Sequence, residues 1–322
     1  MNAPGEQLLI KLWETIADKG IGSLLKPWQK RREGKAEIEL KRQELLVLAQ
    51  TESDANLIRQ GHSRLLPDGT ITEIKHIETE DEKLSLPYIA NVANKNILAD
   101  AIRKEVNLSK TIIFAESELI NDSQAPSDSK VSDDWLFRWK EFASKSSDEQ
   151  IQQLWAKILA GEIKTPGKSS YRLLDLFDKL SRQEIEDISK VFSLTMRNNN
   201  LIVRGTKSDT SFLVTSKLDK GFFEKMGELG IVSQSTSGVM NITTAFDFSE
   251  FNPFHLEYNG FVLSLKKSDT LKDDKLSVMY YSLSKLGQEL FFMAKVPTNR
   301  EYLESLISDF SNSGAISELK VL

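Results

Sequence analysis

Residues 153–167 read QLWAKILAGEIKTPG, and this stretch belongs to the most strongly patterned part of the chain. Its large apolar residues recur at spacings of three and four, which places them on one face of a helix: Trp155, Ile158 and Leu159. A helix with one apolar face buries that face against other elements. The stretch therefore predicts a helical domain built around it.

Both ends of this helix carry recognisable signals. Ser147–Gln150 has the spacing of a capping box, in which two side chains bond to backbone amides at the start of the helix. Gly161 stands where a left-handed C-terminal cap is expected, because glycine adopts positive φ without steric cost. Pro166 and Gly167 then predict a turn. We expect the helix to end at Gly161.

The polar residues after the helix form a candidate interaction surface: Glu162, Lys164, Ser169, Ser170 and Arg172. A loop that pairs a carboxylate with a guanidinium can grip a ligand, or can tie two helices together by charge-assisted hydrogen bonds. We favour the structural role, because buried tryptophans and capped turns are commoner than binding sites.

Helices on both sides complete a four-helix unit with short connections. The preceding helix begins at Ser132 or Asp133 and carries Trp135, Trp139 and Phe142. A helix carrying Leu173, Leu174, Phe177 and Leu180 follows, and the next opens with a second capping box, Ser181–Glu184. We expect a central helical domain at residues 84–198. It also holds helices near 87–106 and 112–120 and a mobile linker at 121–132.

Residues 1–83 are expected to form an N-terminal amphipathic arm, a long helix and a connector. Residues 8–16 and 21–28 have the apolar spacing of two short amphipathic helices. Residues 30–58 are rich in helix-forming side chains with an intermittent apolar seam, which leaves pairing with a second copy open. Pro67–Gly69 predicts a turn between two short β-prone runs.

A basic cluster follows the second amphipathic run: Lys26, Lys30, Arg31, Arg32 and Lys35. This is the arrangement of an interfacial helix on an anionic membrane surface. Glu33 lowers the net charge to about four, and roughly 1 kcal/mol per basic residue gives no firm anchor. We favour an N-terminal helix that docks on the body of the protein, and we keep membrane contact as the alternative.

Residues 199–322 change to a mixed pattern. β-prone runs at 201–204, 241–248, 254–267 and 276–282 are interleaved with a helix around Phe222–Met226. A strand pair followed by a helix entered through Leu283-Ser284-x-x-Gly287-x-x-Leu290 resembles a winged-helix domain. The predicted fold class is therefore mainly α with a C-terminal α+β domain that is winged-helix-like. Its lysines are offset by neighbouring acids, which makes nucleic acid the less expected partner.

Composition narrows the class of protein. A length of 322 residues predicts two or three domains, and 40% hydrophobic with 28% charged residues is ordinary for a soluble globular protein. A net charge of −5 gives no bulk positive surface for nucleic acid. The absence of cysteine excludes disulfides and zinc–sulfur sites and suits a reducing compartment. We expect a cytoplasmic protein, with peripheral contact to the inner membrane as the alternative location.

Long motifs in the chain resemble a known family. The relevant segments are Asp133–Trp135 (DDW), 154–162 (LWAKILAGE), 166–172 (PGKSSYR) and Leu180–Ser181. They are similar to an uncharacterised bacterial domain-of-unknown-function family, most clearly over residues 84–192. The resemblance implies no chemistry. A similarity of layout, an amphipathic N-terminus before a helical body, links the chain to abortive-infection proteins of phage defence by analogy.

No catalytic, cofactor or metal motif stands out. The three histidines lie far apart, and none has two-histidine metal spacing. Gly20–Gly22 lacks the preceding strand and third glycine of a dinucleotide loop. We therefore expect a non-enzymatic interaction or sensor protein, homo-oligomeric or bound to a protein partner, acting in stress or phage defence. The alternatives are a peripheral membrane effector and a DNA-binding regulator, and a catalytic site assembled from distant residues stays open.

Overall fold

The computed structural model describes residues 4–21, 37–66, 68–73, 86–235, 238–239, 242–294 and 296–321. The chain divides into two compact units, Met1–Ser169 and Ser170–Leu322. It combines helices with small antiparallel sheets, which confirms a mixed fold richer in helix than in strand. The predicted three-part division at residues 83 and 198 stays a prediction. No helix among the described residues is both long and apolar enough to cross a bilayer.

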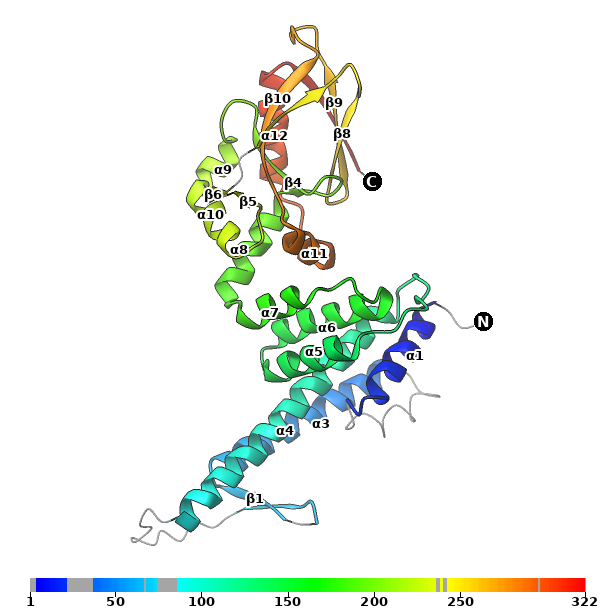
Figure 1. Cartoon of the computed structure of the whole chain (residues 1–322), viewed down its shortest axis with the longest axis vertical. Helices are drawn as coiled ribbons and strands as arrows, with labels where there is room; N and C mark the ends of the chain where they lie inside the picture. Colours follow the sequence, from blue (N-terminus) through cyan, green and yellow to red (C-terminus); the bar gives the residue numbers. More distant parts are fainter. Residues whose placement is uncertain are drawn as a thin grey trace. The chain divides into compact units, whose positions relative to one another are not determined.

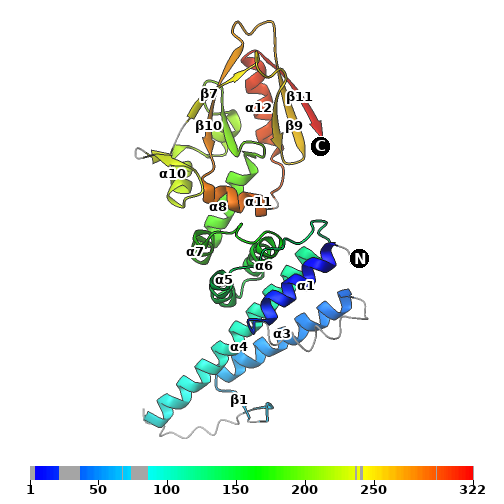
Figure 2. The same cartoon turned by 45° about the vertical axis from the view of Figure 1, so that its right-hand side comes forward.

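Unit 1 is organised around one long helix, α4 (Leu86–Leu119), with α3 (Glu37–Arg59) antiparallel beside it (Figures 1 and 2). Ion pairs fix the register, with Lys110 Nζ 2.7 Å from Glu52 and Arg59 Nη2 2.9 Å from Asp100. The expectation of two separate helices here was wrong. The chain stays helical through residues 107–111, where the buried Asn107 side chain finds hydrogen-bond partners beside the helix and the Thr111 hydroxyl donates to the Asn107 carbonyl oxygen.

A buried polar network at the middle of α4 provides those partners. Asn107 Nδ2 donates to the Ser144 carbonyl oxygen at 3.0 Å, and Gln152 Nε2 donates to Asn107 Oδ1 at 3.2 Å. The same Gln152 amide donates to the Ser146 carbonyl oxygen at 2.8 Å. Because a buried amide without partners is costly, these bonds hold α4 against the α5–α6 connection in one register.

Helices α5 (Asp133–Lys145) and α6 (Glu149–Lys164) bury the predicted tryptophans. Trp139 Nε1 donates to the Trp155 carbonyl oxygen at 3.0 Å, which joins the two helices. The N-cap of α6 is Asp148, whose carboxylate accepts from the Ile151 amide at 3.1 Å, one residue after the predicted Ser147. An aspartate accepts this bond as well as a serine does.

Helix α1 (Pro4–Ala17) docks on α4 and α6 through its apolar side, and Leu8, Leu12 and Ile16 are completely buried. Trp13 Nε1 donates to the buried Glu116 carboxylate at 2.6 Å. Strands β1 (Ser63–Leu65) and β2 (Ile71–Glu73) form the hairpin predicted around residues 67–69. The second amphipathic run and the acidic connector lie outside the described residues.

Unit 2 begins with α7 (Tyr171–Lys179) and α8 (Arg182–Ser193), and the Ser181–Glu184 capping box is confirmed. One sheet has the order β3 (Thr195–Met196), β4 (Leu201–Gly205), β10 (Lys275–Ser282) and β7 (Ile242–Asp247). A second has the order β11 (Ala315–Val321), β9 (Phe261–Lys267) and β8 (Phe254–Tyr258). The remaining elements are α9 (Ser211–Thr215), α10 (Lys220–Glu228), β5 (Gln234–Ser235), β6 (Gly238–Val239), α11 (Lys285–Met293) and α12 (Arg300–Asn312).

Helix α12 contributes four side chains to the core of unit 2, Tyr302, Leu303, Leu306 and Phe310. Tyr302 and Phe310 are completely buried on it, and the Tyr302 hydroxyl donates to the Val203 carbonyl oxygen of β4 at 2.7 Å. The Tyr258 hydroxyl of β8 donates to the Ser193 carbonyl oxygen and accepts from the Asn299 amide. Burial raises the pKa of Tyr258 to about 12. Both tyrosines therefore stay neutral. Their hydroxyl groups join α12 to β4, and β8 to the end of α8 and the start of α12, by hydrogen bonds.

The Leu-Ser-x-x-Gly entry to α11 has a direct physical reason. Ser284 caps the helix, and its hydroxyl accepts from the Gly287 amide at 2.9 Å. A Cβ on Gly287 would lie 2.1 Å from the Ile231 carbonyl oxygen. Only glycine therefore allows this close approach of the helix to residue 231.

Replacement of Gly287 by alanine is expected to lower the free energy of unfolding by about 1–3 kcal/mol, the usual cost of overpacking. Thermal unfolding followed by circular dichroism measures the loss. Gly221→Ala in α10 is the matched control, because its new methyl would meet nothing closer than Asp219 at 3.4 Å. The control is expected to keep or raise stability. An equal loss in both variants would contradict the close-approach argument.

Candidate functional site

The turn after α6 is the first candidate site, and the structure corrects its start. Helix α6 continues to Lys164 with Thr165 as its C-cap, so the expectation that Gly161 ends the helix was wrong. Positive φ occurs instead at Gly167, where φ is 83°. Glu162 and Ile163 are both buried as part of the helix. An end at Gly161 would take these two side chains off the buried face of the helix.

Glu162 holds the turn together from inside. It is almost completely buried, with 1% of its surface exposed. Oε1 accepts from the Gly167 amide at 2.6 Å, and Oε2 accepts from the Ser169 amide at 3.0 Å. Burial raises the pKa of Glu162, and these amide bonds and the nearby Lys11 ammonium act in the opposite direction. The carboxylate therefore acts as a clamp on the backbone of residues 165–169.

The other predicted surface residues divide between the two units. In unit 1, Lys164 Nζ pairs with Asp122 at 2.9 Å, and the Ser169 carbonyl oxygen accepts from Trp135 Nε1 at 2.9 Å. In unit 2, Ser170 caps α7, and its hydroxyl donates to Glu289 Oε2 at 2.8 Å. Arg172 is exposed. Lys164, Ser169 and Ser170 therefore make contacts that stabilise the fold. A role of the predicted interaction surface in binding a partner stays a prediction.

Glu162→Ala is expected to lower the free energy of unfolding by about 2 kcal/mol or more, since two backbone amides lose their acceptor. Arg172→Ala is the control, because the exposed guanidinium makes no comparable contact, and its effect is expected within about 0.5 kcal/mol. Chemical denaturation of both variants measures the difference. Equal stability of Glu162→Ala and wild type would show that the clamp is dispensable and would favour a ligand-binding role.

The raised pKa of Glu162 also predicts a pH dependence. An acid whose folded pKa exceeds its ordinary value of 4.5 is protonated more readily in the folded state. Its contribution to stability is therefore highest below pH 4.5 and is lost as pH rises through the folded pKa. In urea unfolding, the free energy of unfolding of the wild type relative to Glu162→Gln is expected to fall as the pH rises from 4.5 through the folded pKa. A free-energy difference that rises with pH would contradict a raised pKa for Glu162.

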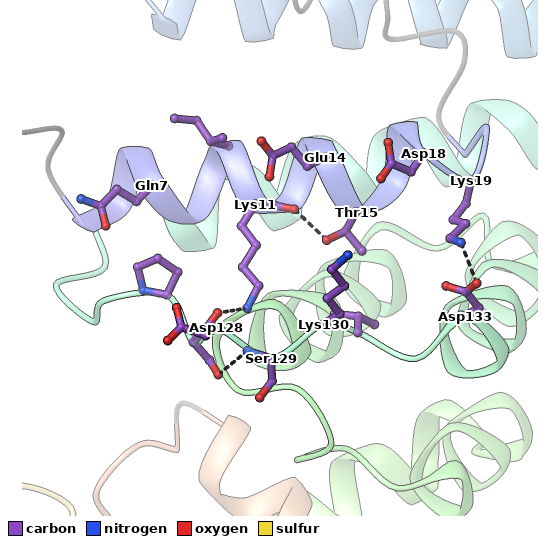
Figure 3. A pocket seen from close by; sticks show the side chains of 14 residues that line it. Gln7, Lys11, Glu14, Thr15, Asp18, Lys19, Asp128, Ser129, Lys130 and Asp133 are labelled. Carbon is purple, nitrogen blue, oxygen red and sulfur yellow. Dashed lines mark hydrogen bonds and ion pairs between the residues drawn. The ribbon is translucent and has the colours of Figure 1, made fainter.

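The second candidate site is a groove of about 650 Å³ between α1 and residues 126–133 of unit 1 (Figure 3). Lys11 reaches across it from α1, and its Nζ donates to the Ser127 carbonyl oxygen at 2.7 Å. Lys19 forms an ion pair with Asp133 at 2.6 Å. The segment predicted as a mobile linker is thus one wall of the groove.

Charges of both signs line the groove. Glu14, Asp18 and Asp128 line it together with the three lysines Lys11, Lys19 and Lys130. Partial burial lowers the pKa of Lys11, while the Asp128 and Glu162 carboxylates act in the opposite direction. Such a lining suits a polar ligand that carries both charges, such as a peptide segment. Among the described residues, no group of His, Asp or Glu is arranged to hold a metal ion.

Sequence reasoning missed the groove because its two walls come from distant segments. In the sequence, Lys11 looks like an ordinary polar residue of an amphipathic helix, between Leu8 and Leu12, which are buried. The predicted membrane-contact residues Lys26, Lys30, Arg31, Arg32 and Lys35 lie outside the described residues. Their role therefore stays a prediction.

A third candidate is an apolar surface at the N-terminal end of α4. Leu86 is 79% exposed and Ile97 is 67% exposed, and Ile89 between them is also exposed. Exposed Leu57 of α3 and the hairpin residues Leu65 and Ile71 belong to the same part of unit 1. Clustered apolar side chains in water are typical of a surface that binds another protein.

Fold and surfaces together define a helix-rich protein of two units, with a polar groove beside α1 and an apolar surface at the N-terminal end of α4. The chain belongs to a family described as a protein of unknown function, DUF2806, which matches residues 92–307. The expected membership in a family of this kind is thereby confirmed, and the match extends well into unit 2. No curated protein and no solved structure matches the chain.

Proposed function

We propose that the protein is a non-enzymatic interaction or sensor protein that works as a homo-oligomer. The observation that supports this most directly is the exposure of Leu86, Ile89 and Ile97 on the first turns of α4. A water-soluble monomer gains nothing from three large apolar side chains on one exposed helix end, whereas an assembly buries them. The groove beside α1 would serve as the sensing site.

A role in bacterial stress or phage defence is part of this proposal. It is supported by the resemblance in layout to abortive-infection proteins, an amphipathic N-terminal helix before a helical body. The helix α1 and the α4-centred body of unit 1 have that order. Loss of protection against phage infection in cells that carry an assembly-deficient variant is the corresponding functional measurement.

The full-length chain is expected to have a solution mass above that of one 36.4 kDa copy, falling on dilution. Apolar burial drives such an assembly, so the mass is expected to change little with salt. Light scattering coupled to size exclusion measures it over a range of protein concentrations. A single-copy mass at every concentration would contradict the proposal.

The first alternative is a peripheral membrane effector that uses the basic residues between Lys26 and Lys35. The apolar side of α1 is buried inside unit 1, so this alternative depends on the residues that follow α1. Flotation with anionic vesicles at low salt, lost at high salt, would support it over assembly in solution.

The second alternative is a DNA-binding regulator with a winged-helix-like C-terminal domain. The capped entry to α11 and the adjoining strand β10 support the winged-helix comparison. The lysines of α10 are engaged with acids, however, since Lys220 lies 3.2 Å from Glu224 and Lys225 lies 3.0 Å from Asp187. DNA binding that weakens steeply with salt would favour this alternative.

A further inference from the structure

The three-stranded sheet of unit 2 has two edges, β8 and β11, because its strand order is β11, β9, β8. The β8 edge is covered by the chain itself. The Glu257 carbonyl oxygen accepts from the Arg197 amide at 2.7 Å, and the Glu257 amide donates to Asn198 Oδ1 at 3.2 Å. Asn198 Nδ2 also donates to the His255 carbonyl oxygen at 2.9 Å. The outward backbone groups of β8 therefore have partners inside unit 2.

The β11 edge is regular and exposed. Its seven residues include no proline or glycine, and they pair with β9 without a bulge (Figure 2). Leu319 is 41% exposed and Val321 is 78% exposed, so α12 packs against the sheet without covering this edge. Proteins usually protect a long, regular edge strand, because its unpaired backbone groups invite pairing with another strand.

The alternation along the strands shows which backbone groups of β11 point outward. Successive residues of a strand turn their N–H and C=O groups to opposite sides. His255 and Glu257 face away from β9, so the even-numbered residues of β8 face β9. They pair with odd-numbered residues of β9, which leaves the even-numbered residues of β9 to bond with their even-numbered partners on β11. The outward groups near the exposed end of β11 are therefore those of Ser317, Leu319 and Val321.

A hydrogen bond just beyond the strands agrees with this alternation. The Ser268 amide donates to the Gly314 carbonyl oxygen at 3.2 Å, and both residues are even-numbered. Within the described part of the chain, no hydrogen bond reaches the outward backbone groups of Ser317, Leu319 and Val321. The β11 edge is thus a row of donors and acceptors that fits another β-strand.

From these observations we infer that β11 of a second copy pairs with β11 in an antiparallel arrangement centred on Leu319. The inference rests on the proposed function of a homo-oligomer, and it names an interface in unit 2. In this register Leu319 lies opposite Leu319 of the second copy, and Ser317 lies opposite Val321. The outward groups of the two strands then form about six backbone hydrogen bonds, since each such residue pair exchanges two.

Charge favours a second copy as the occupant. Glu318 and Lys320 lie on the same face of β11, with Lys320 Nζ 3.5 Å from Glu318 Oε1. In the register centred on Leu319, Glu318 of each copy lies opposite Lys320 of the other, which favours ion pairs across the interface. A shift of two residues in either direction would place Glu318 opposite Glu318 or Lys320 opposite Lys320. A shift of one residue would set the outward groups of one strand against residues whose groups already bond to β9. The strand is therefore complementary to itself in one register.

The pairing also extends the core of the sheet across the interface. Leu319 lies opposite the buried Leu263 of β9, so its side chain is on the inner face of the sheet, where the two Leu319 side chains meet. Main-chain hydrogen bonds supply the affinity when a strand is added to a sheet edge. Few side chains are covered, so the dimer is expected to dissociate on dilution.

Cysteine substitutions test the register directly, because the chain contains no cysteine. Glu318→Cys and Lys320→Cys are each made in the full-length protein. Residues 318 and 320 of the two copies form a non-hydrogen-bonded pair, in which Cα atoms lie about 4.5 Å apart, within the range of a disulfide. A mixture of the two variants is expected to form several-fold more disulfide-linked dimer under mild oxidation than either variant alone.

A proline substitution tests the backbone bonds. Leu319→Pro removes an outward N–H group while the amides that bond to β9 remain, and an edge strand tolerates proline at such a position. This variant is expected to halve the solution mass measured by light scattering. Leu319→Val is the matched control, because it keeps the N–H group and an apolar side chain, and it is expected to retain the wild-type mass. Thermal unfolding followed by circular dichroism checks that both variants fold.

The outcomes separate this inference from the proposed function. An oligomer whose mass Leu319→Pro leaves unchanged overturns the β11 interface but keeps the assembly. Linkage by Glu318→Cys or Lys320→Cys alone that equals the linkage in the mixture overturns the register. A wild-type mass of one copy at all concentrations overturns both the interface and the proposed assembly.

Discussion

The bond between Gln152 and Asn107 is the constraint on which unit 1 depends. Both side chains are almost completely buried, and their amides reach the carbonyl oxygens that connect α5 to α6. A slip of α4 by one residue would leave these polar atoms without partners in a low-dielectric interior. Farther along α4, the Glu116 carboxylate accepts a hydrogen bond from the indole nitrogen of Trp13 on α1.

Glu162 applies the same physical rule at the end of unit 1. A carboxylate is costly to bury, yet this one accepts two backbone amides of a turn that includes a glycine with positive φ. The unit boundary follows immediately, between Ser169 and Ser170. Each of these serines is bonded within its own unit, Ser169 to Trp135 and Ser170 to Glu289. The patterned stretch at 153–167 is thus explained by packing and hydrogen bonding before any ligand is invoked.

Local signals in the sequence predicted local structure well. Amphipathic spacing located α1, α5 and α6, and the Ser181–Glu184 pattern is a capping box in the structure. The errors arose where distant residues decide the outcome. The sequence predicted two helices where α4 is continuous, and the partners that hold Asn107 inside this helix lie on the distant segment near Ser144. Glu162 looked like a surface residue because its acceptor role depends on how the following turn folds back.

The indole groups described in unit 1 have a further consequence for spectroscopy. All five tryptophans of the chain fall within Met1–Ser169, and unit 2 contains tyrosine and phenylalanine only. Emission excited at the red edge of protein absorption therefore originates in unit 1 alone, whereas far-ultraviolet ellipticity samples the helices of both units. A comparison of the two signals distinguishes the melting of one unit from that of the other in the unlabelled protein.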